Sequence, residues 1–519
     1  MVAAGHPATA EAGAEVLRCG GNAVDAAVAA VCTAFIAEPV LTAAGGGGFM
    51  LLRQPNGKAR LYDGFARMPG RNIADIHPDF RAIPVDFGDT LQAFHIGQAS
   101  VATPSLIAML FAAHKESGRI PIREVLQPAM TAARDGLRLN ALQASFINLL
   151  KPILSDTPEC RALHAPTGEL LKEGNCFRNA DLANTLELLA VEGIEEMYKG
   201  DMARSITDAC SPGGLIDIAD LCQPQVNIRE PLVLQALGGE FLTNPAPSSG
   251  GCLIAFSLHL LEELRSQLPD VPLTLLLAEA MHATSMARGE DFDDLVYGPD
   301  MESTFLSPSR LKKAALKAVQ RLKSGSGNGI PGEPGSRLGS TTHISVMDKE
   351  GRAVSLTTSN GEGSGIVVPG TGIHLNNILG EEDINPMGFH RLPGGKTLSS
   401  MMAPSIFVRR GKPELVLGSG GSNRLRGAIL QVLCRHLVSG EDIESAVYAP
   451  RHHNEGNMLD AEPGCFTHAE RHELEKLGWT IRDWQETSVY FGGVHALCMH
   501  DGALRGAGDP RRGGAVACA

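Results

Sequence analysis

The amino-acid sequence predicts an α/β protein in which layers of helix pack on layers of sheet. From about residue 100 to residue 325 apolar residues recur mainly with helical spacing, whereas after residue 340 short β-branched runs alternate with turns. These segments must bury their apolar faces against one another, so stacked helix and sheet layers are the default arrangement. By itself, the length of 519 residues suggests three or four domains at about 150 residues each.

The composition excludes several classes of protein. Hydrophobic residues make up 43% of the chain and charged residues 20%, which is too apolar for a disordered protein. A formal net charge of −13 with 5% aromatic residues argues against binding nucleic acid or an anionic membrane surface. Eleven cysteines, an odd number with no C-x-x-C pair, fit free thiols better than disulfides or a zinc site.

No segment has the pattern of an export signal or a membrane span. The N-terminus lacks a basic region followed by an apolar core, and the longest apolar run, residues 26–37, is too short to cross a bilayer. The simplest expectation is a cytoplasmic enzyme. A periplasmic or secreted location stays open if Met1 is an internal start that has lost an export segment.

The first 50 residues predict two helices and a strand. A helix over residues 11–18 precedes a second one that Asn22 or Asp25 can cap and that runs to about residue 37. The second helix is apolar on nearly every face and should therefore be buried. A strand over residues 49–52 follows a run of four glycines.

Further helices and one low-complexity segment are predicted downstream. Ser324–Ser340, rich in Gly and Ser, predicts a flexible, exposed linker. The helical segments lie near residues 104–115, 122–135, 180–193, 201–209, 274–288, 309–323, 424–437 and 467–477.

Two alternating runs separated by a short turn follow the linker and predict a β-hairpin. A three-residue loop that ends in a left-handed Gly351 places Thr341 opposite Ser359. A two-residue loop instead places Thr341 opposite Thr358. In either register a second hydroxyl lies on the face of Thr341, about 5 Å away between Cβ atoms.

A threonine between a linker and a buried strand suits self-cleavage of the chain. If the Ser340–Thr341 bond breaks, Thr341 gains a free α-amine with a pKa of about 7.7–8.0. That amine is basic enough to take the proton from the hydroxyl of the same residue, and the second hydroxyl can hold the Oγ1 atom by hydrogen bonding.

Ten short motifs give the chain a family resemblance. They are GGNAVDAA at 20–27, GGGGFM at 45–50, LQPA at 126–129, PSSGG at 247–251, TTH at 341–343, NN at 376–377, LSSM at 398–401, GSGGS at 418–422, APR at 449–451 and GDPRR at 508–512. With these motifs in this order, the chain resembles the γ-glutamyltransferase (γ-glutamyltranspeptidase) family of N-terminal-nucleophile hydrolases over almost its whole length.

The resemblance implies a four-layer αββα sandwich and self-cleavage before Thr341. A large subunit, residues 1–340, would end in the linker, and a small subunit, residues 341–519, would stay bound to it as one structural unit. Thr341 would attack the carbonyl of a γ-glutamyl amide such as glutathione. The acyl group would pass to water or to an amine such as an amino acid or peptide, with no metal or organic cofactor.

The resemblance also implies the remaining site residues. Gly420 and Gly421 match the pair whose backbone N–H groups form the oxyanion hole, where the absence of a Cβ permits close approach. Ser399 and Ser400 match the serines that hold the α-carboxylate of the substrate.

Several positions depart from the family pattern and put the acyl specificity in question. Gly361 stands where an Asn is usual, although Asn360 serves if the loop is shorter or if Thr358 is the second hydroxyl. Glu381 replaces the Asp that binds the α-amine of the substrate. Arg71 is a candidate for the carboxylate-binding Arg and equally a candidate for a solvated surface residue.

The histidines near these motifs are interpreted as structural. His452 and His453 are adjacent on a predicted strand and point to opposite faces, so we expect packing or surface roles and no metal. His343 shares a face with Thr341, but the α-amine already supplies the base, so a hydrogen-bonded structural role is favoured.

Three functions stay open. The leading hypothesis is an autoprocessing threonine hydrolase and acyltransferase that acts on γ-glutamyl amides. The second is an amidohydrolase with the same machinery that acts on another small acyl amide, of the oxamate or glutaryl type. The third is a non-cleaving relative that only binds, which the intact Thr341, Ser359, Gly420 and Gly421 argue against.

Overall fold

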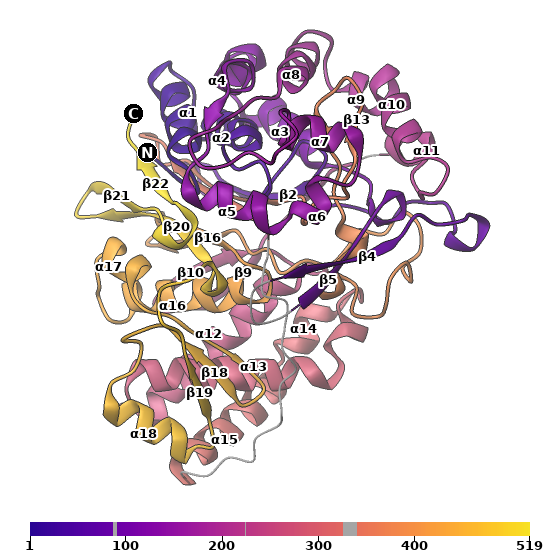
Figure 1. Cartoon of the computed structure of the whole chain (residues 1–519). Helices are drawn as coiled ribbons and strands as arrows, with labels where there is room; N and C mark the ends of the chain where they lie inside the picture. Colours follow the sequence, from indigo (N-terminus) through magenta and orange to yellow (C-terminus); the bar gives the residue numbers. More distant parts are fainter. Residues whose placement is uncertain (87–90, 224, 325–339) are drawn as a thin grey trace.

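The computed structural model describes residues 1–86, 91–223, 225–324 and 340–519 and has the predicted four-layer αββα architecture (Figure 1). Two large antiparallel sheets stack face to face between two layers of helices. Almost all of the predicted linker, residues 324–340, lies outside the described residues.

The first sheet has seven strands and contains the predicted hairpin. Its strands come from both sides of residue 340, and the hairpin lies between strands that precede it in the chain. In spatial order the strands are β22 (Ala515–Ala517), β1 (Val2–Ala4), β11 (Thr342–Met347), β12 (Ala353–Ser359), β2 (Gly47–Arg53), β3 (Ala59–Gly64) and β8 (Asn227–Arg229).

The second sheet has six strands and covers the inner face of the first. Strands β11 and β12 pack directly on β16. In spatial order the second sheet consists of β21 (Ala503–Ala507), β20 (Gly493–His500), β16 (Lys412–Gly420), β15 (Ser405–Arg409), β10 (Gly239–Thr243) and β9 (Leu232–Ala236).

The outer face of the first sheet is covered by a helix layer built around α2, at the top of Figure 1. Every residue of α2 is buried, as its uniformly apolar sequence predicts, and Asn22 caps it in a capping box with Asp25. The layer contains α1 (Pro7–Arg18), α2 (Ala23–Ala37), α3 (Leu106–Ser117), α4 (Ile122–Asp135) and α8 (Ala180–Glu192).

The second helix layer covers the outer face of the six-stranded sheet. The sequence did not predict α12, the helix of this layer that starts within PSSGG at 247–251, because that segment has the composition of a loop. A Cβ at Gly250 would lie 2.0 Å from the carbonyl oxygen of Met401, so the helix needs glycine in its first turn to pack this closely. The layer contains α12 (Ser249–Gln267), α13 (Leu273–Leu295), α15 (Pro308–Ser324) and α16 (Leu425–Leu437).

Shorter elements complete the fold. Among the described residues, no helix is long and apolar enough to span a membrane. The remaining helices are α5 (Ala141–Leu149), α6 (Lys151–Leu154), α7 (Pro158–His164), α9 (Glu195–Lys199), α10 (Asp201–Ala209), α11 (Ile218–Cys222), α14 (Met301–Phe305), α17 (Ile443–Tyr448) and α18 (His468–Lys476). The remaining strands are β4 (Arg81–Asp86), β5 (Leu91–Ile96), β6 (Leu137–Arg138), β7 (Cys176–Phe177), β13 (Val367–Val368), β14 (Ile373–His374), β17 (His452–Glu455), β18 (Met458–Ala461) and β19 (Thr480–Asp483).

Candidate active site

The register of the β11–β12 hairpin places Thr341 opposite Ser359. Thr342 pairs with Thr358, and Gly351 has the left-handed φ of +82° that a three-residue loop requires. The alternative two-residue loop is therefore wrong. The Thr358 hydroxyl lies on the other face of the strand, 3.0 Å from Thr42 Oγ1 and 3.1 Å from the Gly47 carbonyl oxygen.

The hydroxyl of Ser359 contacts the peptide bond that precedes Thr341. It donates a hydrogen bond of 2.5 Å to the carbonyl oxygen of Ser340 and accepts one of 3.0 Å from the Gly361 N–H. The carbonyl of the Ser340–Thr341 peptide bond is therefore polarised by a buried, oriented donor.

Thr341 is buried against the end of β16, with 6% of its surface exposed. A Cβ on Gly420 would lie 2.2 Å from the Thr341 carbonyl oxygen, so glycine is required for this approach. Gly421 follows with a φ of +125°, which side chains rarely adopt. The guanidinium of Arg512 donates a 3.2 Å hydrogen bond to the same Thr341 carbonyl.

A small cavity of about 40 Å³ opens beside Thr341. That volume has room for a few water molecules and falls far below the few hundred Å³ of ordinary ligand pockets. Ser340 forms part of its wall, so the uncut chain occupies space next to Thr341. The lining residues are Phe65, Ser340, Thr341, Ser359, Glu381, Asp383, Ile384, Ser400, Met401, Met402, Ser422 and Leu425.

Three carboxyl groups gather on one side of this cavity. Burial raises the pKa of Glu362 to about 8, and the charge of Asp383 adds to that rise. Burial also raises the pKa of Glu381, and the like charges of Glu362 and Asp383 raise it further. Among the described residues Glu381 Oε1 is buried without a hydrogen-bond partner. The cluster thus holds a proton at neutral pH and has an unused acceptor.

The two serines matched to carboxylate binding lie differently. Ser400 lines the cavity, and its hydroxyl accepts a 3.1 Å hydrogen bond from the Met402 N–H. Ser399 is buried, its N–H donates to the Tyr297 hydroxyl at 3.0 Å, and it does not line the cavity. Of the two serines that the resemblance assigned to carboxylate binding, the described cavity wall therefore includes Ser400 and does not include Ser399.

Asn360 and Arg71 do not reach the described cavity wall. The Asn360 side chain is buried and donates a 3.4 Å hydrogen bond to the carbonyl of Leu375. Arg71 donates to the carbonyl of Gly214 at 3.4 Å.

The three histidines have packing roles. His343 hydrogen-bonds the hydroxyls of Thr357 at 2.8 Å and Ser345 at 3.0 Å, which agrees with a structural role. His452 and His453 are both 2% exposed, so the packing interpretation is correct and the surface one is wrong.

Two charged residues near Thr341 were missed by sequence reasoning. Glu38, just after α2, accepts hydrogen bonds from Thr342 Oγ1 at 2.6 Å and Thr9 Oγ1 at 2.8 Å. Burial raises the pKa of Glu38 to about 7, and the Thr342 and Thr9 hydrogen bonds and the charge of Arg512 oppose the rise. Burial likewise lowers the pKa of Arg512 to about 10. Arg512 lies in the GDPRR motif at 508–512, but both residues are far from residue 341 along the chain, and this distance hides their contacts.

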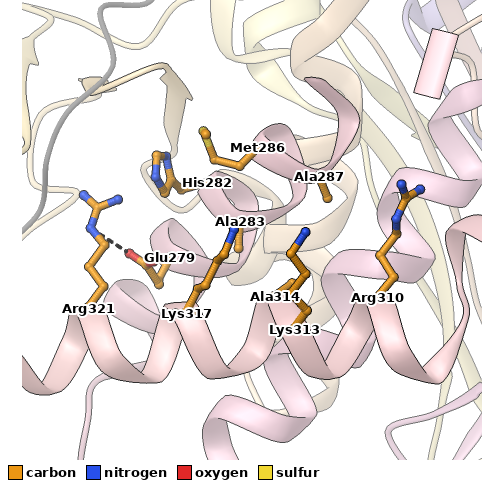
Figure 2. Close-up of a pocket in the computed structure, with 11 residues that line it drawn as sticks. Glu279, His282, Ala283, Met286, Ala287, Arg310, Lys313, Ala314, Lys317 and Arg321 are labelled. Carbon is orange, nitrogen blue, oxygen red and sulfur yellow. Dashed lines mark ion pairs between the residues drawn. The ribbon is translucent and has the colours of Figure 1, made fainter. Parts of the chain in front are cut away.

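A second hollow, of about 220 Å³, lies between α13 and α15 and has a different character (Figure 2). Four basic side chains surround it, and Glu279 pairs with Arg321 at 3.6 Å. Among the residues described as lining it, none also lines the cavity at Thr341 and none is Ser, Thr or Cys. It therefore offers no hydroxyl or thiol nucleophile for acyl transfer.

Comparison with known proteins places these residues in context. The family model described as gamma-glutamyltranspeptidase matches residues 9–519. The chain is 30% identical to the glutathione hydrolase proenzyme of Bacillus subtilis (strain 168), over 99% of this chain and 91% of the relative. It is also 30% identical to the acylase ACY 1 proenzyme of Pseudomonas sp. (strain V22), over 98% of this chain and 91% of the relative.

Among solved structures, the cephalosporin acylase from Bacillus halodurans superposes with a TM-score of 0.85 at 23% sequence identity. The alignment covers 100% of this chain and 95% of that one, and it establishes a shared fold.

Proposed function

Because the chain belongs to the γ-glutamyltranspeptidase family of hydrolases, we propose that it is a self-processing threonine hydrolase that cleaves γ-glutamyl amides. The observation that carries this proposal is the Ser359 hydroxyl on the Ser340 carbonyl oxygen, 2.5 Å away. A buried donor aimed at that carbonyl favours nucleophilic attack there by the adjacent Thr341. The "proenzyme" in the names of both relatives supports cleavage into two chains.

Self-cleavage would proceed by an acyl shift within the chain. Thr341 Oγ1 bonds to the Ser340 carbonyl carbon, the Ser340–Thr341 C–N bond breaks, and the proton of the hydroxyl passes to the nitrogen, which becomes the α-amine of Thr341. Water then hydrolyses the resulting ester to free the Ser340 carboxylate. The products are a large subunit of residues 1–340 and a small subunit of residues 341–519. Departure of the Ser340 end from the cavity wall would enlarge the site.

Turnover of the substrate would use the same groups a second time. The freed α-amine of Thr341 takes the proton from Oγ1, which attacks the amide carbonyl of the substrate. Gly420 adjoins Thr341 and Gly421 follows it in the chain, and the backbone N–H groups of this pair would be the donors for the tetrahedral oxygen. The leaving amine takes up the proton, and water or an amine acceptor then removes the acyl group from Thr341.

The carboxyl cluster supports an acyl group that carries an ammonium. Glu381 and Asp383 line the cavity, Glu362 is close to both, and no Lys or Arg is among the lining residues described. An ammonium would satisfy the orphaned Glu381 Oε1. A γ-glutamyl and a glutaryl group both carry a carboxylate, but only the γ-glutamyl group adds an ammonium that this acidic wall would attract. An oxamate group also has a carboxylate and no ammonium. The γ-glutamyl class is thus favoured over those alternatives, although the chain is equally similar to the hydrolase and the acylase named above.

A matched pair of substrates tests this assignment. γ-Glutamyl-p-nitroanilide and glutaryl-p-nitroanilide differ by the α-amine alone, and the γ-glutamyl compound is expected to have the higher kcat/KM. Glu381→Gln should reduce that preference by about 10-fold or more, since it removes a charge-assisted contact. Glu382→Gln, at the exposed neighbouring position, is the matched control.

The result that would overturn the substrate assignment is equal or faster turnover of the glutaryl compound. Turnover of neither compound by a chain that has cut itself would also reject it. Adding a dipeptide acceptor and measuring γ-glutamyl dipeptide separates transfer from hydrolysis.

A further inference from the structure

Cys160, His164 and His374 form a buried cluster that the proposed chemistry does not use. Cys160 and His164 lie four residues apart on α7 and therefore share one face of the helix. His374 comes from β14, and one donor atom from each of the three residues lies within 4.8 Å of the others. Their side chains are 0%, 1% and 5% exposed.

Three of the four ring nitrogens of the two imidazoles are buried without a hydrogen-bond partner among the described residues. Among the described residues, neither ring nitrogen of His164 has a hydrogen-bond partner, and Nε2 of His374 also has none. Each unsatisfied buried donor costs about 1–3 kcal/mol. The His164 ring is held by stacking on Phe177 at 5.4 Å, and its centroid is 6.1 Å from that of His374. A group bound between these side chains would satisfy nitrogens that the protein itself leaves unpaired.

We propose that Cys160, His164 and His374 bind one zinc ion. A thiolate with two imidazoles is a ligand set that suits zinc, with bonds of about 2.0–2.3 Å. Tetrahedral ligands at those bond lengths lie about 3.4–3.8 Å apart. The donor atoms here lie within 4.8 Å of one another, so the most distant pair must move together by about 1 Å when the ion binds. A water completes the fourth position, and binding releases the Cys160 proton to solvent.

The position of the cluster gives the ion a structural role. Cys160 and His164 precede the Ser340–Thr341 bond, whereas His374 follows it. If the chain is cut as proposed above, the ion would join the two subunits. α7 is already tied to the same region, because its N-cap Thr157 donates a 2.7 Å hydrogen bond to the Gly365 carbonyl.

The ion would also steady the loop that carries Glu362. The His374 ring packs so closely on Gly363 that a Cβ there would lie 2.4 Å from His374 Cε1. Fixing the ring therefore fixes the backbone next to Glu362 and, through it, the carboxyl side of the cavity. A bridging water between the imidazoles is the competing occupant.

Metal content and a cobalt spectrum test the site directly. The full chain is purified without chelator, and zinc is measured by mass spectrometry, with one ion per chain expected. After removal of zinc and loading with Co²⁺ alone, a thiolate-to-cobalt charge-transfer band in the near ultraviolet is expected. Cys160→Ser should abolish the band, whereas Cys210→Ser, at another buried free thiol, should retain it.

The spectrum of the unmutated chain keeps the test decisive even if Cys160→Ser fails to fold. Substoichiometric zinc together with no charge-transfer band in excess Co²⁺ would overturn the proposal and assign the cluster to water. A band that survives Cys160→Ser would also overturn it. The measurements are repeated on uncleaved Thr341→Ala, where binding is expected to be unchanged. A failure of self-cleavage, which bears on the proposed function, can thereby be told apart from a failure to bind the metal, which bears on this site.

Discussion

Replacing Ser359 by alanine should stall self-cleavage while the chain still folds. In the structure this hydroxyl donates to the Ser340 carbonyl oxygen at 2.5 Å and accepts from the Gly361 N–H at 3.0 Å. The first bond stabilises the negative charge that develops on the Ser340 oxygen during attack by Thr341. The second bond fixes the rotamer of the hydroxyl.

The size of the effect follows from these two contacts. Loss of one oriented oxyanion donor costs about 10²–10³ in rate, or about 3–4 kcal/mol of transition-state stabilisation. The orphaned Gly361 N–H costs a further 1–3 kcal/mol of folding stability, roughly, because it is buried. A chain of this size tolerates that loss, so the variant should accumulate as a folded precursor of 54.8 kDa.

The assay is a time course of denaturing gels and intact masses after rapid purification. The matched control is Thr358→Val, which removes the neighbouring hydroxyl on the opposite face of β12, where it contacts Thr42 and Gly47. That control should be less stable but should cut itself at close to the normal rate. If Ser359→Ala processed normally while Thr358→Val stalled, the assignment of the second hydroxyl would be wrong.

Two further predictions concern the surroundings of Thr341. Gly420→Ala should lower activity by at least about 10²-fold, because the new Cβ would lie 2.2 Å from the Thr341 carbonyl oxygen. The control Gly289→Ala, in open space on α13, should leave activity unchanged. Equal rates for the two variants would refute the steric argument. Burial raises the Glu38 pKa to about 7, so the folded chain keeps a proton that the unfolded chain releases near pH 4.5. Stability from this residue therefore falls as pH rises from about 4.5 to 7 and then levels off. The test compares two uncleaved chains, Thr341→Ala and Thr341→Ala with Glu38→Gln, by their free energies of unfolding in denaturant. The first value minus the second should be smaller at pH 8 than at pH 5, and a difference that does not depend on pH would contradict the prediction.

Local signals predicted the parts of the structure that depend on near neighbours in the chain. The sequence predicted the hairpin and left two registers open, and the left-handed φ of Gly351 in the structure selects the three-residue loop. The buried helix α2 followed from its apolar composition and from Asn22 at its N-cap. α12 was missed because its glycine-rich first turn has the composition of a loop. In the structure Gly250 is needed there for the close approach to Met401.

Contacts between distant segments were beyond reach of the sequence. Glu38, Glu362 and Arg512 lie near Thr341 because two sheets and a helix layer converge there. The cluster at α7 was hidden for the same reason: Cys160 and His164 have ligand-like spacing, but His374 is 210 residues further on. Ser399 and Asn360 were matched by position in a motif; both are buried, and neither is among the residues described as lining the cavity.

The most direct test of the central claim is the intact mass of the purified chain with and without the Thr341 hydroxyl. We expect two fragments from the unmutated chain, divided between Ser340 and Thr341, with threonine at the new N-terminus of the 341–519 fragment. Thr341→Ala should remain a single chain of about 54.8 kDa. A persistent single chain in both proteins, or a cut at another bond that Thr341→Ala leaves intact, would contradict the account.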